Sequence, residues 1–262
     1  MTRQELNIAA RFACRLALEA AAVIKAGFRK NRPVTFKGRI DPVTEYDLKA
    51  ERLIVRRIAR RFPDHEILTE EGGAKGITSE YCWVVDPLDG TVNYAHGFPI
   101  YCVSIALQYC GQTLAGAVCD PERGELFWSA RGERSCLNRK AISVSQENRL
   151  ERALLATGFA YDIGTARRNN LGLFARMARK AQGIRRPGSA AIDLCWLACG
   201  RVDGFWELKL HPWDTAAATL IVENAGGRVS RIDGRHYSVF APDLLASNGL
   251  IHNAMRRVLT HR

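Results

Sequence analysis

The feature that most constrains this chain is an apolar segment that runs directly into two aspartates. Residues 82–85 (CWVV) predict a buried strand, and residues 86–91 (DPLDGT) follow it without a break. We expect Asp86 and Asp89 to lie where the strand ends and a loop begins, because ligands of open α/β sheets bind at the carboxyl ends of strands. Two carboxylates so close repel each other unless a cation lies between them, and the motif holds no lysine or arginine. The motif therefore predicts a hard, oxygen-preferring metal ion.

Three neighbours of these aspartates favour a ligand site over an ordinary turn. Pro87 fixes one backbone angle and stiffens the segment between the two acids. Gly90 permits close approach of the backbone to a ligand. Thr91 can cap a following helix, whose free N–H groups would suit a phosphate.

Two other acidic segments have ordinary explanations when each is taken alone. Glu70 and Glu71 fit a charged loop, and Asp214 fits the aspartate that often caps a helix. Trp213 and a proline beside Asp214 are also compatible with a loop that aims the carboxylate inward.

Length and composition describe a protein with a sizeable core. The chain has 262 residues, of which 47% are hydrophobic, and no apolar run approaches the roughly 18–20 residues of a membrane span. The amino end lacks the pattern of a secretory signal, so we expect a cytoplasmic protein without a membrane partner. Its eight cysteines form no C-x-x-C pair, which predicts reduced thiols packed as small apolar groups.

The formal net charge of +11 predicts a surface that attracts anions without choosing among phosphate esters, nucleic acid and acidic lipid. The densest basic group comprises the arginines at positions 52, 56, 57, 60 and 61. Their spacing favours the solvated face of a helix over a nucleic-acid groove, since no aromatic side chains alternate with them.

The hydrophobic pattern predicts two halves that differ in organisation. In the first, Thr2 and Glu5 cap a long helix with an apolar stripe that includes Ile8, Thr44 caps a second helix over 45–61, and hairpins of an antiparallel sheet follow. In the second, strands over 154–157, 202–208 and 244–247 alternate with helices over 165–182, 189–199, 214–225 and 250–260. We expect an α+β half over 1–147 and an α/β half over 148–262, packed as one structural unit.

Several motifs together resemble the inositol monophosphatase family. Residues 83–94 (WVVDPLDGTVNY) look like its first signature, and residues 213–227 resemble its second. Residues 69–71, 43–47 and 186–191 also fit, so that the likeness spans nearly the whole chain. The resemblance implies an α/β fold in which layers are stacked as an αβαβα sandwich, like that of fructose-1,6-bisphosphatase.

The same resemblance implies a metal-binding role for five positions. Glu70, Asp86 and the Leu88 carbonyl would hold one Mg²⁺, whereas Asp86, Asp89 and Asp214 would hold a second. A third, weaker Mg²⁺ would lie near Glu70 with mostly water ligands, so that two to three ions are expected per subunit.

Further positions are implied to act on the substrate. Thr91, hydrogen-bonded to Asp47, would help Glu70 orient a metal-bound water. Glu207 matches the position that contacts a substrate hydroxyl, and Lys37 resembles a lysine near the metal loop. The expected substrate contacts are Asp89, the amides of Gly90 and Thr91, Ser189, Ala190, Glu207 and Asp214.

The resemblance implies a Mg²⁺-dependent, lithium-sensitive phosphatase that is a homodimer and hydrolyses a small polyol phosphate, with myo-inositol 1-phosphate as the first candidate. Histidinol phosphate and fructose 1,6-bisphosphate are alternatives, although a carboxylate at Glu207 would repel a second phosphate. A regulatory protein associated with RNA or the transcription machinery is a rival from another class, and the net charge would suit it.

Overall fold

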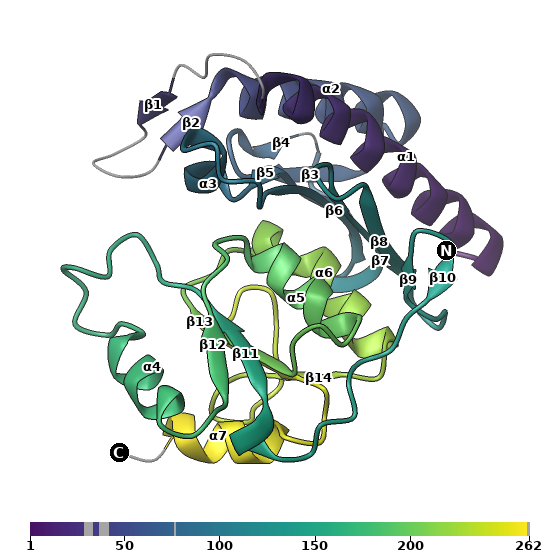
Figure 1. Ribbon diagram of the computed structural model, residues 1–262. Helices are drawn as coiled ribbons and strands as arrows, with labels where there is room; N and C mark the ends of the chain where they lie inside the picture. The colour runs from purple at the N-terminus through teal and green to yellow at the C-terminus, as the bar shows by residue number, and fades with distance from the viewer. Residues whose placement is uncertain (29–33, 37–41, 76, 261–262) are drawn as a thin grey trace.

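The computed structural model describes residues 1–28, 34–36, 42–75 and 77–260. Two long helices, α1 (Arg3–Phe28) and α2 (Glu45–Arg61), form an outer layer (Figure 1). Both begin as predicted: Thr2 Oγ1 accepts the Glu5 N–H at 3.3 Å, and Thr44 Oγ1 accepts the Tyr46 N–H at 3.2 Å. The predicted apolar stripe of α1 is wrong at Ile8, which is 41% exposed, because alanines face the sheet there instead.

Beneath these helices lies an eight-stranded sheet in the order β10-β9-β8-β7-β6-β5-β3-β4. All neighbouring strands are antiparallel except β3 and β5, which confirms the predicted hairpins. The strands are β3 (Glu66–Thr69), β4 (Gly73–Lys75), β5 (Tyr81–Asp89), β6 (Cys102–Tyr109), β7 (Gln112–Asp120), β8 (Glu125–Ala130), β9 (Cys136–Leu137) and β10 (Lys140–Ala141).

The strand predicted over 82–85 is longer in the structure, because β5 continues through Asp86 and ends at Asp89. Asp86 pairs with Ser104 of β6 and Asp89 with Cys102, with a shift of register between the two pairs. The irregularity lies within the Asp-Pro-Leu-Asp segment at the carboxyl end of β5, and both carboxylates line the same pocket.

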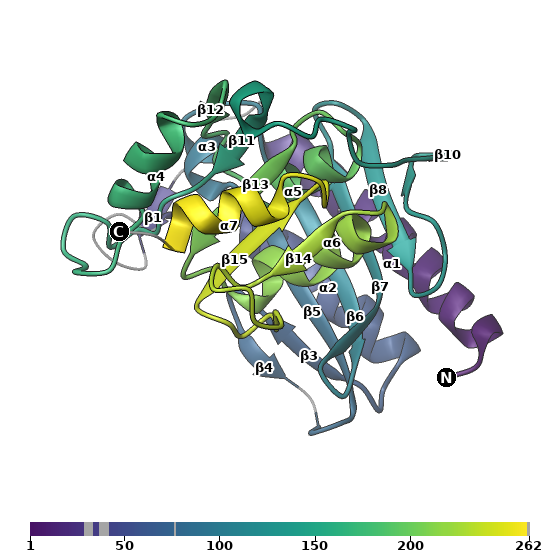
Figure 2. The same ribbon diagram turned by 90° about the horizontal axis from the view of Figure 1, so that it is seen from below.

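The second half of the chain supplies the remaining layers. Helices α5 (Ala190–Ala198) and α6 (Pro212–Asn224) lie between the large sheet and a five-stranded sheet in the order β12-β11-β13-β15-β14 (Figure 1). Its strands are β11 (Leu154–Thr157), β12 (Gly183–Arg185), β13 (Gly204–Leu208), β14 (Arg228–Ser230) and β15 (Asp243–Ser247). Helices α4 (Leu171–Ala178) and α7 (His252–Thr260) cover the far side (Figure 2). The predicted αβαβα sandwich is thereby confirmed.

The shorter elements are a hairpin of β1 (Val34–Phe36) and β2 (Pro42–Thr44), the one-turn helix α3 (Thr91–Ala95) and the 3₁₀ turn η1 (Leu150–Arg152). The predicted helix over 165–182 is wrong in extent, since only α4 forms there. Arg168 instead forms an ion pair with Asp243, and Asn170 donates hydrogen bonds to Thr157 Oγ1 and to the Gly158 carbonyl. Tertiary bonds thus replace the first turns of the expected helix.

The central core joins the two sheets through the α5–α6 layer. One continuous cluster contains Val84 of β5, Val118 of β7, Ile192 of α5, Ile221 of α6 and Phe205 of β13, all buried. Separate clusters lie beneath α1 and α2 and beneath α4 and α7. None of the described helices has the length and apolar character needed to cross a bilayer.

Candidate active site

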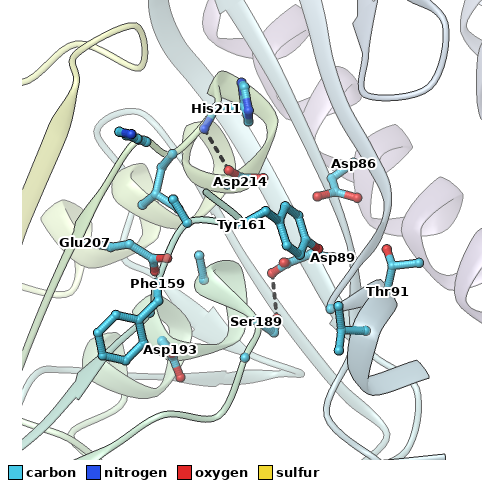
Figure 3. A pocket seen from close by; sticks show the side chains of 18 of the residues that line it. Asp86, Asp89, Thr91, Phe159, Tyr161, Ser189, Asp193, Glu207, His211 and Asp214 are labelled. Atoms are coloured by element: carbon cyan, nitrogen blue, oxygen red, sulfur yellow. Dashed lines mark hydrogen bonds between the residues drawn. The ribbon is translucent and has the colours of Figure 1, made fainter. Parts of the chain in front are cut away.

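A pocket of about 550 Å³ opens where the end of β5 meets the starts of α5 and α6. Figure 3 shows Asp86, Asp89 and Thr91 on one side and Glu207 and Asp193 on the other. The pocket is lined by nearly all the site residues predicted from the sequence: Glu70, Asp86, Leu88, Asp89, Gly90, Thr91, Ser189, Ala190, Glu207 and Asp214. Asp47 lies behind Thr91, and Lys37 falls outside the described residues.

Three aspartates in this pocket each use one oxygen to bind the protein. Asp86 Oδ1 accepts the Leu88 N–H at 2.9 Å, and Asp214 Oδ2 accepts the His211 N–H at 2.7 Å. Asp89 Oδ2 accepts the Ser189 hydroxyl at 2.6 Å and an N–H from the first turn of α5 at 2.9 Å. These bonds fix each side chain, and they leave the second oxygen of each aspartate available to a ligand.

The carboxylates also act on one another through their charges. Burial raises the pKa of Asp86 well above its usual range, and the neighbouring charges of Glu70, Asp89 and Asp214 raise it further. Burial likewise raises the pKa of Asp214, with Asp89 as the next cause. Burial raises the pKa of Asp89, although its bonds to Ser189 and to α5 oppose the shift. A positive charge placed among these groups would stabilise all of their ionised forms.

The hydroxyl of Thr91 is held at the edge of this acidic group. Thr91 Oγ1 lies 3.0 Å from the Leu88 carbonyl and 3.4 Å from Asp47 Oδ1. Asp47 is buried in the first turn of α2, where its other oxygen accepts the Thr44 N–H at 3.0 Å. Burial raises the pKa of Asp47 to about 6, against the hydrogen bonds from Thr44. The structure therefore brings Thr91 and Asp47 together as predicted.

The side-chain amide of Asn93 joins the loop at Gly90 to the loop before α5. Asn93 Nδ2 donates to the Ile100 carbonyl and to the Pro187 carbonyl, both at 2.8 Å. Gly90 has φ +91°, and a Cβ there would lie 2.9 Å from the Ile100 carbonyl oxygen. Only glycine fits this left-handed position without displacing the backbone opposite. The junction places the β5 aspartates against the amino end of α5.

The opposite end of the pocket holds two buried carboxyl groups, of which only Glu207 was expected. Burial raises the pKa of Glu207 to about 8, although Arg186 lowers it. Burial raises the pKa of Asp193 well above its usual range, and Glu207 is the next cause. Asp193 was missed because it stands in an apolar helix. Its spacing of four residues from Ser189 was the available signal, since both then lie on one face of α5.

Aromatic side chains and one ion pair line the mouth of the pocket, and neither was predicted from the sequence. Phe159 and Tyr161 follow β11 and line the opening (Figure 3). Lys209 Nζ pairs with Asp162 Oδ2 at 2.5 Å and so ties this segment to the loop before α6. In Figure 3, Tyr161 lies between Glu207 and the aspartates of β5, and Phe159 lies beside Glu207 and Asp193.

The donor set suits a hard cation, since it consists of carboxylate oxygens with the Leu88 carbonyl beside them. In the described part of the chain, no three acidic, histidine or cysteine side chains are arranged as a complete metal-binding group. All eight cysteines are free thiols, and none lines the pocket. The chemistry of the ligands thus fits the predicted ion.

Comparisons with known proteins agree with this geometry. The model of the inositol monophosphatase family matches residues 5–261. The chain is 45% identical to the inositol-1-monophosphatase of Synechocystis sp., over 92% of this chain and 85% of that protein. It is 42% identical to the Nus factor SuhB of Pseudomonas aeruginosa, over 82% of this chain and 81% of that protein.

A solved inositol monophosphatase from Anabaena (Nostoc) sp. superposes with a TM-score of 0.90 at 41% identity, covering 97% of this chain and 96% of that one. The fold, the two signatures and the whole-length match all agree. The chain is therefore a phosphatase that belongs to the inositol monophosphatase family.

Proposed function

We propose that this protein hydrolyses the phosphate monoester of a small polyol, with myo-inositol 1-phosphate as the first candidate. The observation that carries the proposal is the convergence of Glu70, Asp86, Asp89 and Asp214, from segments far apart in the chain, on one pocket. Buried carboxyls at the other end suit hydroxyl groups. The name of the Synechocystis relative, an inositol-1-monophosphatase, supports the same substrate.

We further propose that the ions are Mg²⁺, two to three per subunit. Glu70, Asp86 and the Leu88 carbonyl would hold the first, and Asp86, Asp89 and Asp214 the second, with a third near Glu70. When bound, such ions activate a water and stabilise the entering and leaving oxygens of an in-line displacement. Lithium would inhibit by competing for these ligands.

The protein's own groups would position the reactants. Thr91 Oγ1, held by Asp47 and the Leu88 carbonyl, would fix the attacking water together with Glu70. The Gly90 and Thr91 amides would bind the phosphate, because the left-handed Gly90 leaves the backbone open to a ligand. Ser189 and Ala190 would contact the edge of the substrate, and Glu207 would accept one of its hydroxyls.

Replacement of Asp86 by asparagine tests the mechanism. Asp86→Asn keeps the size of the side chain and removes the charge, so we expect Mg²⁺-dependent phosphate release to fall by more than the roughly 10- to 100-fold that loss of an outer-shell partner costs. The control is Asp233→Asn, which changes an aspartate paired with Arg235 on the surface. Equal turnover by the two variants would refute the proposed metal site.

A panel of esters tests the substrate. Myo-inositol 1-phosphate, histidinol phosphate and fructose 1,6-bisphosphate are compared by kcat/KM at matched metal concentration. We expect the bisphosphate to be the poorest, because a second phosphate would lose its hydration among the buried carboxyls of Glu207 and Asp193. A preference for either alternative ester would replace the inositol assignment while leaving the phosphatase intact.

A homodimer is proposed from a second, largely apolar groove of about 680 Å³. Phe98, which is 51% exposed, and Trp196 line it together with the paired side chains of Arg201 and Glu125. A second copy of the chain would cover this surface, and light scattering across protein concentration measures the mass. A strictly monomeric protein would contradict the proposal. The cytoplasmic location stays a prediction.

A second candidate role in transcription rests on one exposed surface. Arg52, Arg56, Arg57 and Arg60 are all exposed on α2, and among the acids of the described segments only Glu19 forms an ion pair with one of them, Arg57, at 3.0 Å. The Pseudomonas relative carries the name of a Nus factor. RNA binding whose affinity falls steeply with salt, and which persists in Asp86→Asn, would support this role. Weak binding that is unchanged when these arginines become glutamines would exclude it.

A further inference from the structure

The far end of the pocket contains two carboxyl groups whose hydrogen-bonding capacity the protein leaves unmet. Asp193 is 1% exposed and Glu207 is 8% exposed, and both line the pocket. Asp193 Oδ1 is buried without a hydrogen-bond partner among the described residues. Neither carboxyl receives a hydrogen bond from the described protein, in contrast to the three aspartates at the phosphate end.

Such an arrangement is unfavourable for the folded chain. A buried acceptor without a donor loses its hydration and gains nothing in return, and native proteins contain few of them. Arg186 influences both carboxyls by its charge, but it is an exposed side chain at the rim and forms no ion pair with either of them in the described structure. The missing donors must come from water or from a molecule bound in the pocket, which these two carboxyls line.

The positions of Asp193 and Glu207 in the fold also favour contact with a bound molecule. Asp193 lies one turn into α5, and Ser189, which binds Asp89, caps the same helix. The rigid helix therefore fixes the separation between Asp193 and the phosphate end. Glu207 belongs to β13, which packs against α5, and Figure 3 shows both acids on the side of the pocket opposite Asp86 and Thr91. A substrate whose phosphate lies at Asp89 would extend its organic part toward this pair.

The chemistry of the pair favours hydroxyl groups over an ammonium group. A protonated carboxyl donates one hydrogen bond and accepts others, and a hydroxyl group can both receive and return such bonds. An ammonium group only donates, and it would bind best to ionised acids. Burial raises the pKa of both acids and so favours their neutral forms, which suit the hydroxyl groups.

We propose that Asp193 is a specificity-determining residue, which binds a second hydroxyl group of the polyol beside the one bound by Glu207. This inference rests on the proposed phosphatase function and assigns the part of the substrate that the metal ligands do not touch. The substrate class it implies is an ester whose alcohol carries at least two hydroxyl groups on neighbouring carbons.

The test uses Asp193→Leu, which keeps the branched shape of the side chain and removes both oxygens, and Asp193→Asn, which keeps one acceptor oxygen. Two substrates share a six-membered ring: myo-inositol 1-phosphate has free hydroxyls, and cyclohexyl phosphate has none. We expect Asp193→Leu to lower kcat/KM for the inositol ester about 10-fold or more. Its kcat/KM for the cyclohexyl ester should stay within about 2-fold of the wild-type value. The kcat/KM of Asp193→Asn for the inositol ester should lie between those of Asp193→Leu and the wild type. Glu223→Gln, an exposed acid on α6, is the matched control.

Thermal unfolding supplies a readout that does not depend on activity. If Asp193 is retained for a ligand, its removal relieves the unmet acceptors, and the midpoint for Asp193→Leu should rise by about 2–4 °C. A lower midpoint, or an equal loss of kcat/KM on both esters, would assign Asp193 a structural role and overturn the inference.

Two other outcomes separate this inference from the proposed function. A wild-type enzyme that hydrolyses cyclohexyl phosphate as well as the inositol ester would overturn the hydroxyl assignment while leaving the phosphatase intact. If Asp193→Leu loses more kcat/KM on histidinol phosphate than on the inositol ester, the group that Asp193 binds would be an ammonium group and not a hydroxyl group. If the wild type hydrolyses no ester of the panel, the proposed function fails, and the inference fails with it.

Discussion

Asp86, Asp89 and Asp214 each use one carboxylate oxygen for hydrogen bonds to the protein, and the proposed metal ions would take the other. The protein-facing oxygens are held by Leu88, Ser189 and His211, groups that lie next to the acids in the sequence or at the start of a helix. Such partners orient a carboxylate without neutralising it, which is the usual task of groups around a metal site. Among the described residues, none donates such a bond to Glu207 or Asp193, as we expect if these two acids bind the alcohol and the aspartates bind metal ions.

Glu207 makes the stability of the protein depend on pH. Its pKa is raised from 4.5 to about 8 by burial, so the folded protein binds a proton that the unfolded chain releases. This contribution is complete below the unfolded pKa and is lost as the pH rises through the folded value. Without divalent ions, we expect the free energy of unfolding in urea to fall between about pH 5 and about pH 8, and to fall less in Glu207→Gln. Glu223→Gln should keep the wild-type slope, and a steeper loss in Glu207→Gln would contradict the assignment.

For single residues, a role in the site could be predicted from the sequence where the neighbouring residues form a recognisable motif. Asp86, Asp89 and Gly90 stand in one contiguous segment whose composition indicates its chemistry. Asp193 stands among alanine, isoleucine and leucine, and its place in the pocket depends on which face of α5 turns toward β13. That orientation is set by packing over the whole layer, which no local pattern encodes.

At the level of elements, the site depends on how closely α6 lies on the large sheet. A Cβ on Gly116 of β7 would lie 2.7 Å from the Cα of Ala217 on α6. The same helix carries Asp214, and the same sheet carries Asp86. The distance between these two acids is therefore governed by small residues at the contact of α6 with the sheet, of which Ala217 lies about one helical turn from Asp214.

Replacement of Gly116 by valine should separate α6 from the sheet. We expect a loss of stability of about 1–3 kcal/mol, the usual result of overpacking, together with a lower kcat at saturating Mg²⁺. Urea unfolding and steady-state kinetics measure the two effects. Gly172→Ala in α4, where a Cβ meets nothing within 4 Å, should be neutral or stabilising. Full activity in a destabilised Gly116→Val would show that the spacing of the layers does not set the site.

The sequence predicted most elements but not all of their limits. Capping residues at Thr2 and Thr44 placed the starts of α1 and α2 correctly, because a cap is a local interaction. The end of β5 and the start of α4 were misplaced, because Asp86 pairs with Ser104 across the sheet and Asn170 bonds to the strand before it. Both depend on partners that are distant in the chain or on a neighbouring layer.

For the whole molecule, the central core decides how the two halves behave. Buried side chains of β5 and β7 pack in the same cluster as those of α5, α6 and β13. We propose that the expected halves, 1–147 and 148–262, unfold together. Calorimetry without metal should show one transition with equal calorimetric and van't Hoff enthalpies, and two resolved transitions would establish independent domains.

Metal binding should stabilise the folded protein to an extent that grows with pH. The ligand carboxyls must be ionised to bind a cation, and burial raises the pKa of Asp86 and Asp214. We expect saturating Mg²⁺ to raise the unfolding midpoint more at about pH 8 than at about pH 5.5, and to have little effect on Asp86→Asn. An equal rise in wild type and variant would mean that the ion acts elsewhere.

The contact of Asn93 with both Ile100 and Pro187 has a consequence for the evolution of this enzyme. The Asn93 amide joins the turn after β5 to the segment that leads into α5. A substitution in either segment must therefore preserve this contact. We therefore expect substitutions farther along α5 to change which alcohol binds, while the Asn93 contacts keep the aspartates of β5 in place against the start of α5.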